Sequence, residues 1–223
     1  MKNEMQLKAL IKKIAQDKHI QAQAVMQNYM FERLLERISL SDFKDKFILK
    51  GGMLIAAMVG LEHRSTLDMD ATIRNYPINE ADIQSAFEKI TKIDIGDDVT
   101  LAFTGVERIR EDTEYGGLRV SLEARFINIK VWLKVDITTD DVITPGPVRY
   151  TMNTMFEERP ITVWAYNLET VIAEKYETIM RRGVSNTRPR DFLRCLYAVE
   201  ITESKHKLAI APTSHKCNGE STR

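Results

Sequence analysis

Two acidic residues, Asp68 and Asp70, stand in a short run in which polar and apolar side chains alternate. This alternation is typical of a half-buried β-strand, so both carboxylates are expected on one face. A strand rises about 3.3 Å per residue, which places their Cα atoms roughly 6.6 Å apart. Two like charges held this closely repel each other, and a bound divalent cation is the usual compensation. The pair therefore predicts a cation site on a sheet, although an Asp-x-Asp strand alone also fits a solvated face.

A third carboxylate, Asp136, lies in a second alternating segment, residues 127–137. The odd positions of this segment are apolar, so Asp136 is expected to point with Lys134 away from the core. Two aspartates on one strand and a third on a neighbouring strand can hold two Mg²⁺ ions for phosphoryl or nucleotidyl transfer. Taken alone, Asp136 equally fits a surface residue paired with Lys134.

Three other features carry weaker chemical signals. The pair Gly51-Gly52 lets backbone approach a phosphate closely, and the turn after it offers free N–H groups at a helix start. Lys175 falls on or beside the apolar stripe of its predicted helix, where an ammonium group must reach solvent or meet an anion. Asp191 stands in the first turn of the next predicted helix, where it also fits simple stabilisation by the positive helix end.

Length and composition are those of an ordinary globular chain. The 223 residues can bury one sizeable core. Because 32 basic residues balance 32 acidic ones, no excess of positive charge indicates a nucleic-acid partner. Two cysteines, Cys195 and Cys217, give no disulfide framework and fit a reducing compartment, with the cytoplasm as the default. The N-terminal segment has scattered charges and no long apolar stretch, which argues against a signal peptide or a membrane span.

The periodicity of the chain predicts both helices and strands. Helical spacing indicates two helices within residues 5–38 and further helices at 53–59, 78–92, 168–182 and 190–201. Asn167 is placed to cap the helix that starts at residue 168. Alternation predicts strands at 67–73 and within 99–137, and a turn containing Pro145 and Pro147 marks a candidate domain seam.

Several segments, taken in order, resemble the AbiEii/AbiGii toxin family, nucleotidyltransferase-like proteins of bacterial abortive-infection and type IV toxin–antitoxin systems. The resemblance covers roughly residues 1–192. Its segments are Lys50-Gly51-Gly52, Arg64-Ser65 with Asp68 and Asp70, Lys134-Val135-Asp136-Ile137, Tyr166 to Thr170, Ala173-Glu174-Lys175, Asn186-Thr187-Arg188 and Arg190-Asp191-Phe192.

The resemblance implies an α+β fold with a DNA polymerase β-type nucleotidyltransferase core, a mixed sheet flanked by helices. The chain is expected to divide into N-terminal helices at 1–46, the core at 47–150, a shortened C-terminal helical region at 151–203 and a disordered tail at 204–223. The implied activity is a Mg²⁺-dependent transfer of a nucleotide from an NTP to RNA, for related toxins the 3′ end of tRNA.

Residue by residue, the resemblance assigns Asp68, Asp70 and more loosely Asp136 to the metal. Lys175 and Asp191 match the remaining catalytic positions, and Lys175 is also expected at the triphosphate. The other positions expected at the nucleotide are Lys50, Gly51, Gly52, Arg64 and Ser65. An AbiEi-type antitoxin encoded nearby is the implied partner.

Two departures from the family pattern keep an alternative open. Leu193-Arg194-Cys195 stands where an aromatic stretch with a second aspartate is expected. The last twenty or so residues show neither the periodicity nor the apolar content of a folded segment, which suggests a truncation or frameshift after Phe192. The alternative is a truncated relative that binds a nucleotide or an antitoxin but transfers nothing. A kinase or phosphatase using the same carboxylates is disfavoured by the absence of a Walker-type loop. Neither the NTP nor the RNA acceptor is specified by the sequence.

Overall fold

The structure is a computed structural model that describes residues 3–59, 67–77, 79–109, 116–139, 141–157 and 159–182. Its helices are α1 (Glu4–Asp17), α2 (Ala22–Leu40), α3 (Gly51–Val59), α4 (Glu80–Thr91) and α5 (Leu168–Arg182). Its strands are β1 (Phe47–Lys50), β2 (Met69–Ile73), β3 (Val99–Ile109), β4 (Gly117–Phe126), β5 (Ile129–Thr139), β6 (Val148–Asn153) and β7 (Pro160–Ala165).

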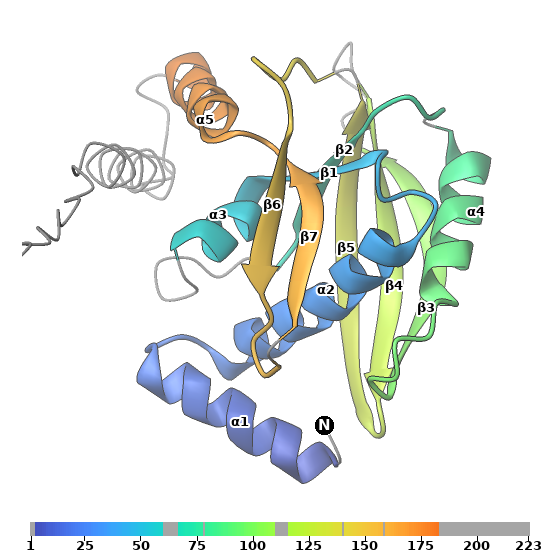
Figure 1. The fold of residues 1–223 in the computed structure, drawn as a ribbon, viewed down its shortest axis with the longest axis vertical. Coiled ribbons are helices and arrows are strands. Elements are labelled where there is room, and N and C mark those ends of the chain that lie inside the picture. The colour runs from blue at the N-terminus through green and yellow to red at the C-terminus, as the bar shows by residue number, and fades with distance from the viewer. Residues whose placement is uncertain are drawn as a thin grey trace, which may run out of the picture.

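The strands form a seven-stranded sheet in the order β3-β4-β5-β2-β1-β7-β6 (Figure 1). The pairs β2–β5 and β1–β7 are parallel, and the other neighbours are antiparallel. The sheet is therefore mixed, and with the helices around it the predicted α+β class is confirmed. The expected strands at 67–73 and 99–137 are present, whereas β1 was not predicted because four consecutive buried residues show no alternation.

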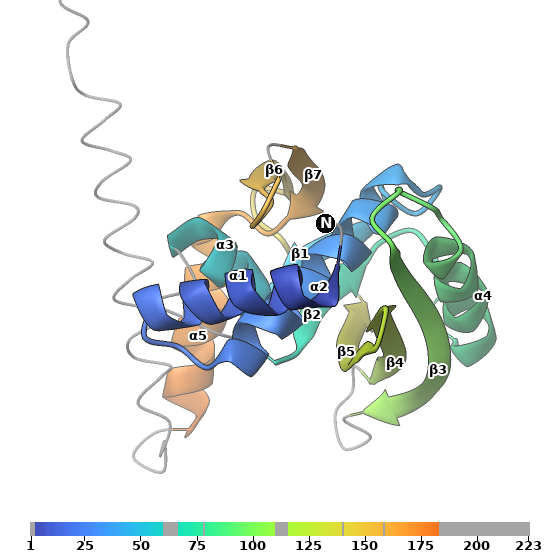
Figure 2. The same cartoon turned by 90° about the horizontal axis from the view of Figure 1, so that it is seen from below.

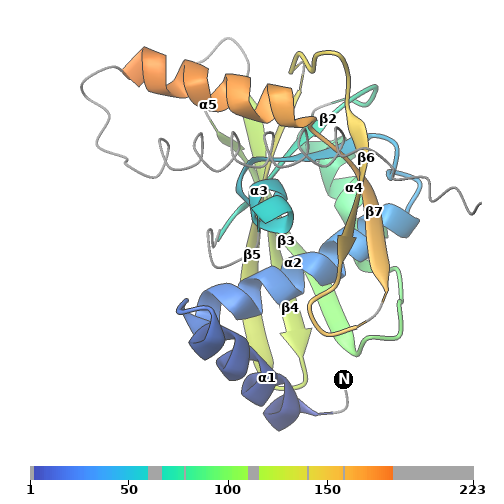
Figure 3. The ribbon, with the colours of Figure 1, turned by 60° about the vertical axis from the view of Figure 1, so that its left-hand side comes forward.

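One face of the sheet packs against α2, which contacts β5, β7 and α4, while α1 lies on the outer side of α2 (Figures 1 and 2). Alternate residues of β5, including Leu133, Val135 and Ile137, are completely buried. Lys134 between them is exposed and Asp136 is half-buried, as the alternation predicted. The opposite face at Asp136 is thus left for polar side chains, and α5 crosses the end of the sheet near α3 (Figure 3).

The predicted helical region from residue 151 needs a correction. Residues 148–153 and 160–165 form the hairpin β6–β7, which joins the sheet through β1. In β7, Ile161, Val163 and Ala165 are buried and alternate with less buried residues, a strand pattern that the proline-rich turn had obscured. Helix α5 begins where predicted, with Asn167 Oδ1 accepting the Thr170 N–H at 2.7 Å.

The helix predicted at 190–201 and the tail at 204–223 lie outside the described residues, and the division into domains stays a prediction. Among the helices that the structure describes, none combines the length and the apolar character that crossing a membrane requires.

A buried ion pair fastens α2 to the chain that leads into β3. Arg37 donates to both carboxylate oxygens of Asp97, at 3.0 and 2.8 Å, and to the Val99 carbonyl oxygen at 2.6 Å. The two side chains are only 3% and 1% exposed. Because water can reach neither group, losing one partner leaves a buried charge without compensation.

We expect Asp97→Asn to lower the free energy of unfolding by about 3 kcal/mol, since the substitution keeps the shape but strands the Arg37 charge. The matched control is Glu80→Gln, which breaks the exposed pair of Arg108 and Glu80, whose side chains are 70% and 51% exposed. That loss should stay below about 1 kcal/mol. Urea unfolding curves for the two variants measure the difference, and equal losses would contradict a special role for the buried pair.

Candidate active site

Asp68 and Asp70 lie on the sheet face opposite α2, at the beginning of β2. Between them, Met69 is fully buried in the core, so the two carboxylates leave the strand on the same, opposite side. Both aspartates are half-buried. The pKa of Asp68 is raised, first by burial and then by the charges of Asp136 and Asp70, while Arg119 lowers it. Burial therefore disfavours the charged form of Asp68, and the neighbouring carboxylates add to this effect.

Helix α2 holds this segment in place from the other side of the sheet. The Gln27 amide nitrogen donates to the Leu67 carbonyl oxygen at 2.7 Å and to the Trp132 carbonyl oxygen at 3.1 Å. These bonds tie the residue before Asp68 to strand β5. Sequence reasoning missed Gln27, because its partners lie 40 and 105 positions away.

The glycine pair stands directly against Asp70. Gly51 has a φ of +65°, a backbone conformation that residues other than glycine rarely adopt. A Cβ at this position would lie 2.0 Å from Asp70 Oδ2, an impossible contact. The Gly52 N–H, at the start of α3, is 3.4 Å from the same oxygen. Gly51 is therefore required both by its backbone angle and by the room that Asp70 occupies.

Four charged residues form a row across four neighbouring strands. Arg119 on β4 is opposite Asp136 on β5, Asp136 is opposite Asp70 on β2, and Asp70 is opposite Lys50 on β1. Asp70 and Asp136, in the middle of the row, are thus flanked by a basic residue on each side. Paired residues in register project to the same face, so the row lies on the open side of the sheet.

The structure brings Asp136 to Asp70 as predicted, but Asp136 is held by a residue that was not predicted. Arg119 donates from Nε and one terminal nitrogen to the two oxygens of Asp136, at 2.7 and 2.8 Å. This bidentate bond raises the pKa of Arg119. Among the described residues, no group of three acidic, histidine or cysteine side chains is arranged to hold a metal ion.

Lys50, predicted at the nucleotide, forms ion pairs within the chain. Its Nζ lies 2.5 Å from Asp141 Oδ2 and 3.7 Å from Glu174 Oε1. Asp141 Oδ2 also accepts from Thr138 Oγ1 at 2.6 Å and from the Tyr166 hydroxyl at 2.7 Å. Burial alone would raise the pKa of Asp141, but these bonds and the Lys50 charge outweigh it and lower the pKa to about 2.

Helix α5 brings Lys175 to this side of the molecule. Glu174, its neighbour, has a pKa raised mainly by burial, with Lys50 and Lys175 lowering it and Asp141 and Asp70 raising it further. Glu174 lies in the middle of α5, so its 3.7 Å approach to Lys50 brings this helix close to the Lys50 end of the row of charges. Arg64, Ser65 and Asp191, the other predicted site residues, lie outside the residues that the structure describes.

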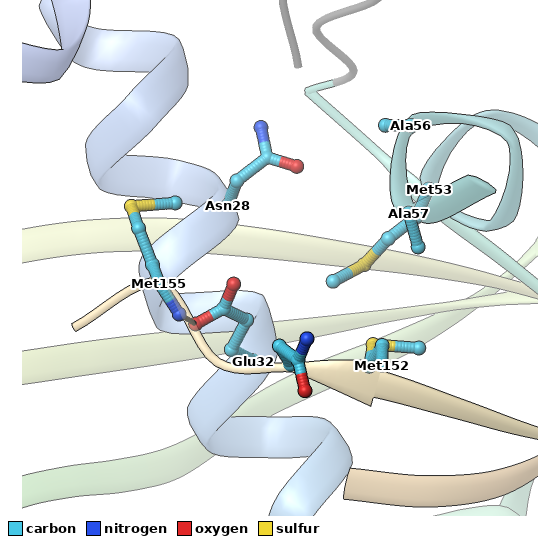
Figure 4. Close-up of a pocket in the computed structure, with 8 residues that line it drawn as sticks. Asn28, Glu32, Met53, Ala56, Ala57, Met152 and Met155 are labelled. Atoms are coloured by element: carbon cyan, nitrogen blue, oxygen red, sulfur yellow. Dashed lines mark hydrogen bonds between the residues drawn. The ribbon is translucent and has the colours of Figure 1, made fainter. Parts of the chain in front are cut away.

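A separate hollow of about 260 Å³ opens between α2, α3 and β6 (Figure 4). None of the predicted site residues lines it; its lining residues are Asn28, Glu32, Met53, Ala56, Ala57, Met152, Asn153 and Met155. Glu32 Oε2 accepts the Met155 N–H at 2.9 Å. Burial raises the pKa of Glu32 to about 7, and the bond to Met155 and the nearby Arg33 only partly offset this effect.

Comparison with solved structures supports the fold. The chain is similar to JHP933 from Helicobacter pylori, with 14% identity, a TM-score of 0.51, and coverage of 82% of this chain and 68% of that one. It is also similar to an antigenic nucleotidyltransferase-like protein from Paracoccidioides brasiliensis, with 14% identity, a TM-score of 0.47, and coverage of 82% and 87%. No curated protein matches the chain.

A family model matches residues 33–213, most of the chain, and its description is "Nucleotidyl transferase AbiEii toxin, Type IV TA system". This match and the sheet with its acidic face define the class of the protein, which is a nucleotidyltransferase. More narrowly, the chain belongs to the AbiEii toxin family, as the sequence motifs predicted. Membership in a type IV toxin–antitoxin family implies an NTP substrate and an antitoxin partner.

Gly51→Ala is expected to lower the free energy of unfolding by about 3 kcal/mol, from backbone strain plus displacement of Asp70. Gly96 is the matched control, because its φ is +66° but nothing lies within 4 Å of an added Cβ. Gly96→Ala should therefore cost only about 1 kcal/mol. In an Asp70→Gly background, Gly51→Ala should fall to about the same 1 kcal/mol, since that substitution removes Oδ2, Cγ and Cβ of Asp70, the three atoms that lie within 3 Å of the added Cβ. An unchanged cost in that background would refute the contact.

Glu32→Gln is expected to stabilise the protein at pH 8 by about 1–3 kcal/mol and to have little effect at pH 5. Folding raises the pKa of Glu32, so the unsubstituted protein loses stability as pH rises from about 4.5 through 7. Glutamine keeps an oxygen for the Met155 N–H and carries no charge. Unfolding free energies at the two pH values measure this, with the exposed Glu107→Gln as control.

Proposed function

We propose that this chain transfers a nucleotide from an NTP to an RNA acceptor, the 3′ end of tRNA, with Asp68 and Asp70 holding Mg²⁺. The observation that carries the proposal is the acidic pair on the open sheet face, with Gly51 fitted against Asp70. Family membership supports the reaction class, and the implied tRNA acceptor comes from the resemblance.

A divalent cation fits the residues present. Mg²⁺ prefers carboxylate oxygens and keeps several waters, so two aspartates with substrate phosphates suffice. The pKa of Asp68 is raised first by burial and then by the charges of Asp136 and Asp70, and a cation would offset that negative charge. When bound, the ion supplies Lewis-acid stabilisation of phosphate charge.

The chain's own residues then position the substrates. In the transfer, the acceptor hydroxyl oxygen forms a bond to the α-phosphorus of the NTP, the bond to the β-phosphate oxygen breaks, and pyrophosphate leaves. The hydroxyl loses its proton to water. Gly51 and the start of α3 let backbone N–H groups approach the phosphates, and Lys175 on α5 brings positive charge to the triphosphate. Asp191, Arg64 and Ser65 complete the site in this proposal.

We also propose that the antitoxin partner is of the AbiEi type and that growth arrest follows from the modified tRNA. The competing function is a relative that binds a nucleotide or an antitoxin without transfer. An acidic face that binds a cation fits both functions, so a direct assay must separate them.

Asp70→Asn is expected to reduce nucleotide transfer at least about a hundredfold and to abolish growth arrest, because it removes a metal ligand. Purified protein, total RNA and each labelled NTP in turn identify the donor and the acceptor. The control is Asp42→Asn, which makes the same change at an exposed turn. Equal arrest by Asp70→Asn and unsubstituted protein would contradict catalysis. Absence of both labelling and arrest in the unsubstituted chain would favour the binding relative.

A further inference from the structure

The bond between Arg119 and Asp136 bears on how many cations the site takes. A carboxylate that accepts a bidentate guanidinium uses both oxygens in the plane where a metal ion would otherwise bind. The Arg119 and Asp136 side chains are 28% and 13% exposed, so the pair is partly shielded from water. Asp136 therefore has a close positive partner within the chain itself.

We propose that Arg119 takes the place of a second metal ion: it holds Asp136, and the site binds one divalent cation on Asp68 and Asp70. This inference rests on the proposed function, because it presumes a cation at that pair. It differs from the expectation of three metal-binding carboxylates, in which Asp136 is a direct ligand.

The charge row explains why an arginine can fill this place. Asp136 is adjacent in register to Asp70 on one side and to Arg119 on the other, and Arg119 bonds to both of its carboxylate oxygens. One guanidinium thus offsets the charge of Asp136 beside Asp70. Arginine stays charged and planar, so it can offset this charge permanently and in a fixed geometry. Arg119 acts through Asp136 and is a positioning residue.

Mn²⁺ serves as the probe, with the unbound ion counted by electron paramagnetic resonance. We expect one Mn²⁺ per chain in the unsubstituted protein and loss of binding in Asp70→Asn. Arg119→Gln should raise the affinity about tenfold, since it removes a positive charge and releases Asp136. Arg119→Lys keeps the charge without the bidentate fork and should lie between the two.

The decisive variant combines Arg119→Gln with Asp136→Asn, which leaves the net charge unchanged. If Arg119 holds Asp136, this double variant keeps the original affinity within about threefold. If Asp136 is a direct ligand, the double variant loses at least about tenfold, and two Mn²⁺ per chain would equally overturn the inference. Thermal melting checks that each variant is folded, and a variant that is not folded is replaced by the Arg119→Lys comparison.

Failure of the proposed function gives a different result. In that case the unsubstituted chain binds no Mn²⁺, or Asp70→Asn binds it as well as the unsubstituted chain does. Either result removes the cation site itself and overturns the inference with it. Loss of affinity confined to the double variant, with Asp70 still required, rejects only the role of Arg119.

Discussion

The site depends on like charges held side by side on one sheet face. Asp70 and Asp136 are paired in register on parallel strands, and Asp68 lies two residues before Asp70. Repulsion among three carboxylates would destabilise the sheet if nothing compensated it. The chain compensates at one end of the row, where Arg119 is bound to Asp136; at the other end Lys50 is opposite Asp70 in register, but its ion pairs are with Asp141 and Glu174. The remaining negative charge lies at Asp68 and Asp70, the pair proposed above to hold the cation.

This accumulation of charge needs a rigid support. Helix α2 supplies it, because the helix is buried on almost every side and carries charged residues whose partners come from distant parts of the chain. Arg37 fastens α2 to Asp97, and Gln27 fastens the segment before Asp68 to β5. Since Arg37 and Asp97 are buried and Gln27 is nearly buried, moving any of these elements would leave polar groups without partners. The position of the acidic pair is therefore set from the core side of the sheet.

Local patterns predicted the strand faces but not their pairing. Alternation around Asp68 and Asp136 correctly placed both side chains away from the core, and helical spacing located α5 with its Asn167 cap. The strand register could not be predicted in this way. Arg119 is one of several polar residues on an alternating strand, and only the pairing of β4 with β5 shows that it is the partner of Asp136. Asp141 follows β5 without any period to distinguish it. Contacts between residues far apart in the sequence, such as Arg119 with Asp136 and Lys50 with Asp141, leave no pattern in the local sequence.

Lys50 shows how register and burial change the interpretation of a motif residue. As part of a glycine-containing motif it was expected to contact the nucleotide. In the structure its ammonium group is nearly buried, bonds to Asp141 and lies near Glu174 and the Tyr166 ring. A lysine whose charge is already compensated has little left to offer a phosphate. Its ion pairs join β1 to Asp141 after β5 and to Glu174 in the middle of α5, and the residue after Glu174 is Lys175. Lys50 therefore links β1 to α5, the helix that carries Lys175, and its role at the nucleotide stays a prediction.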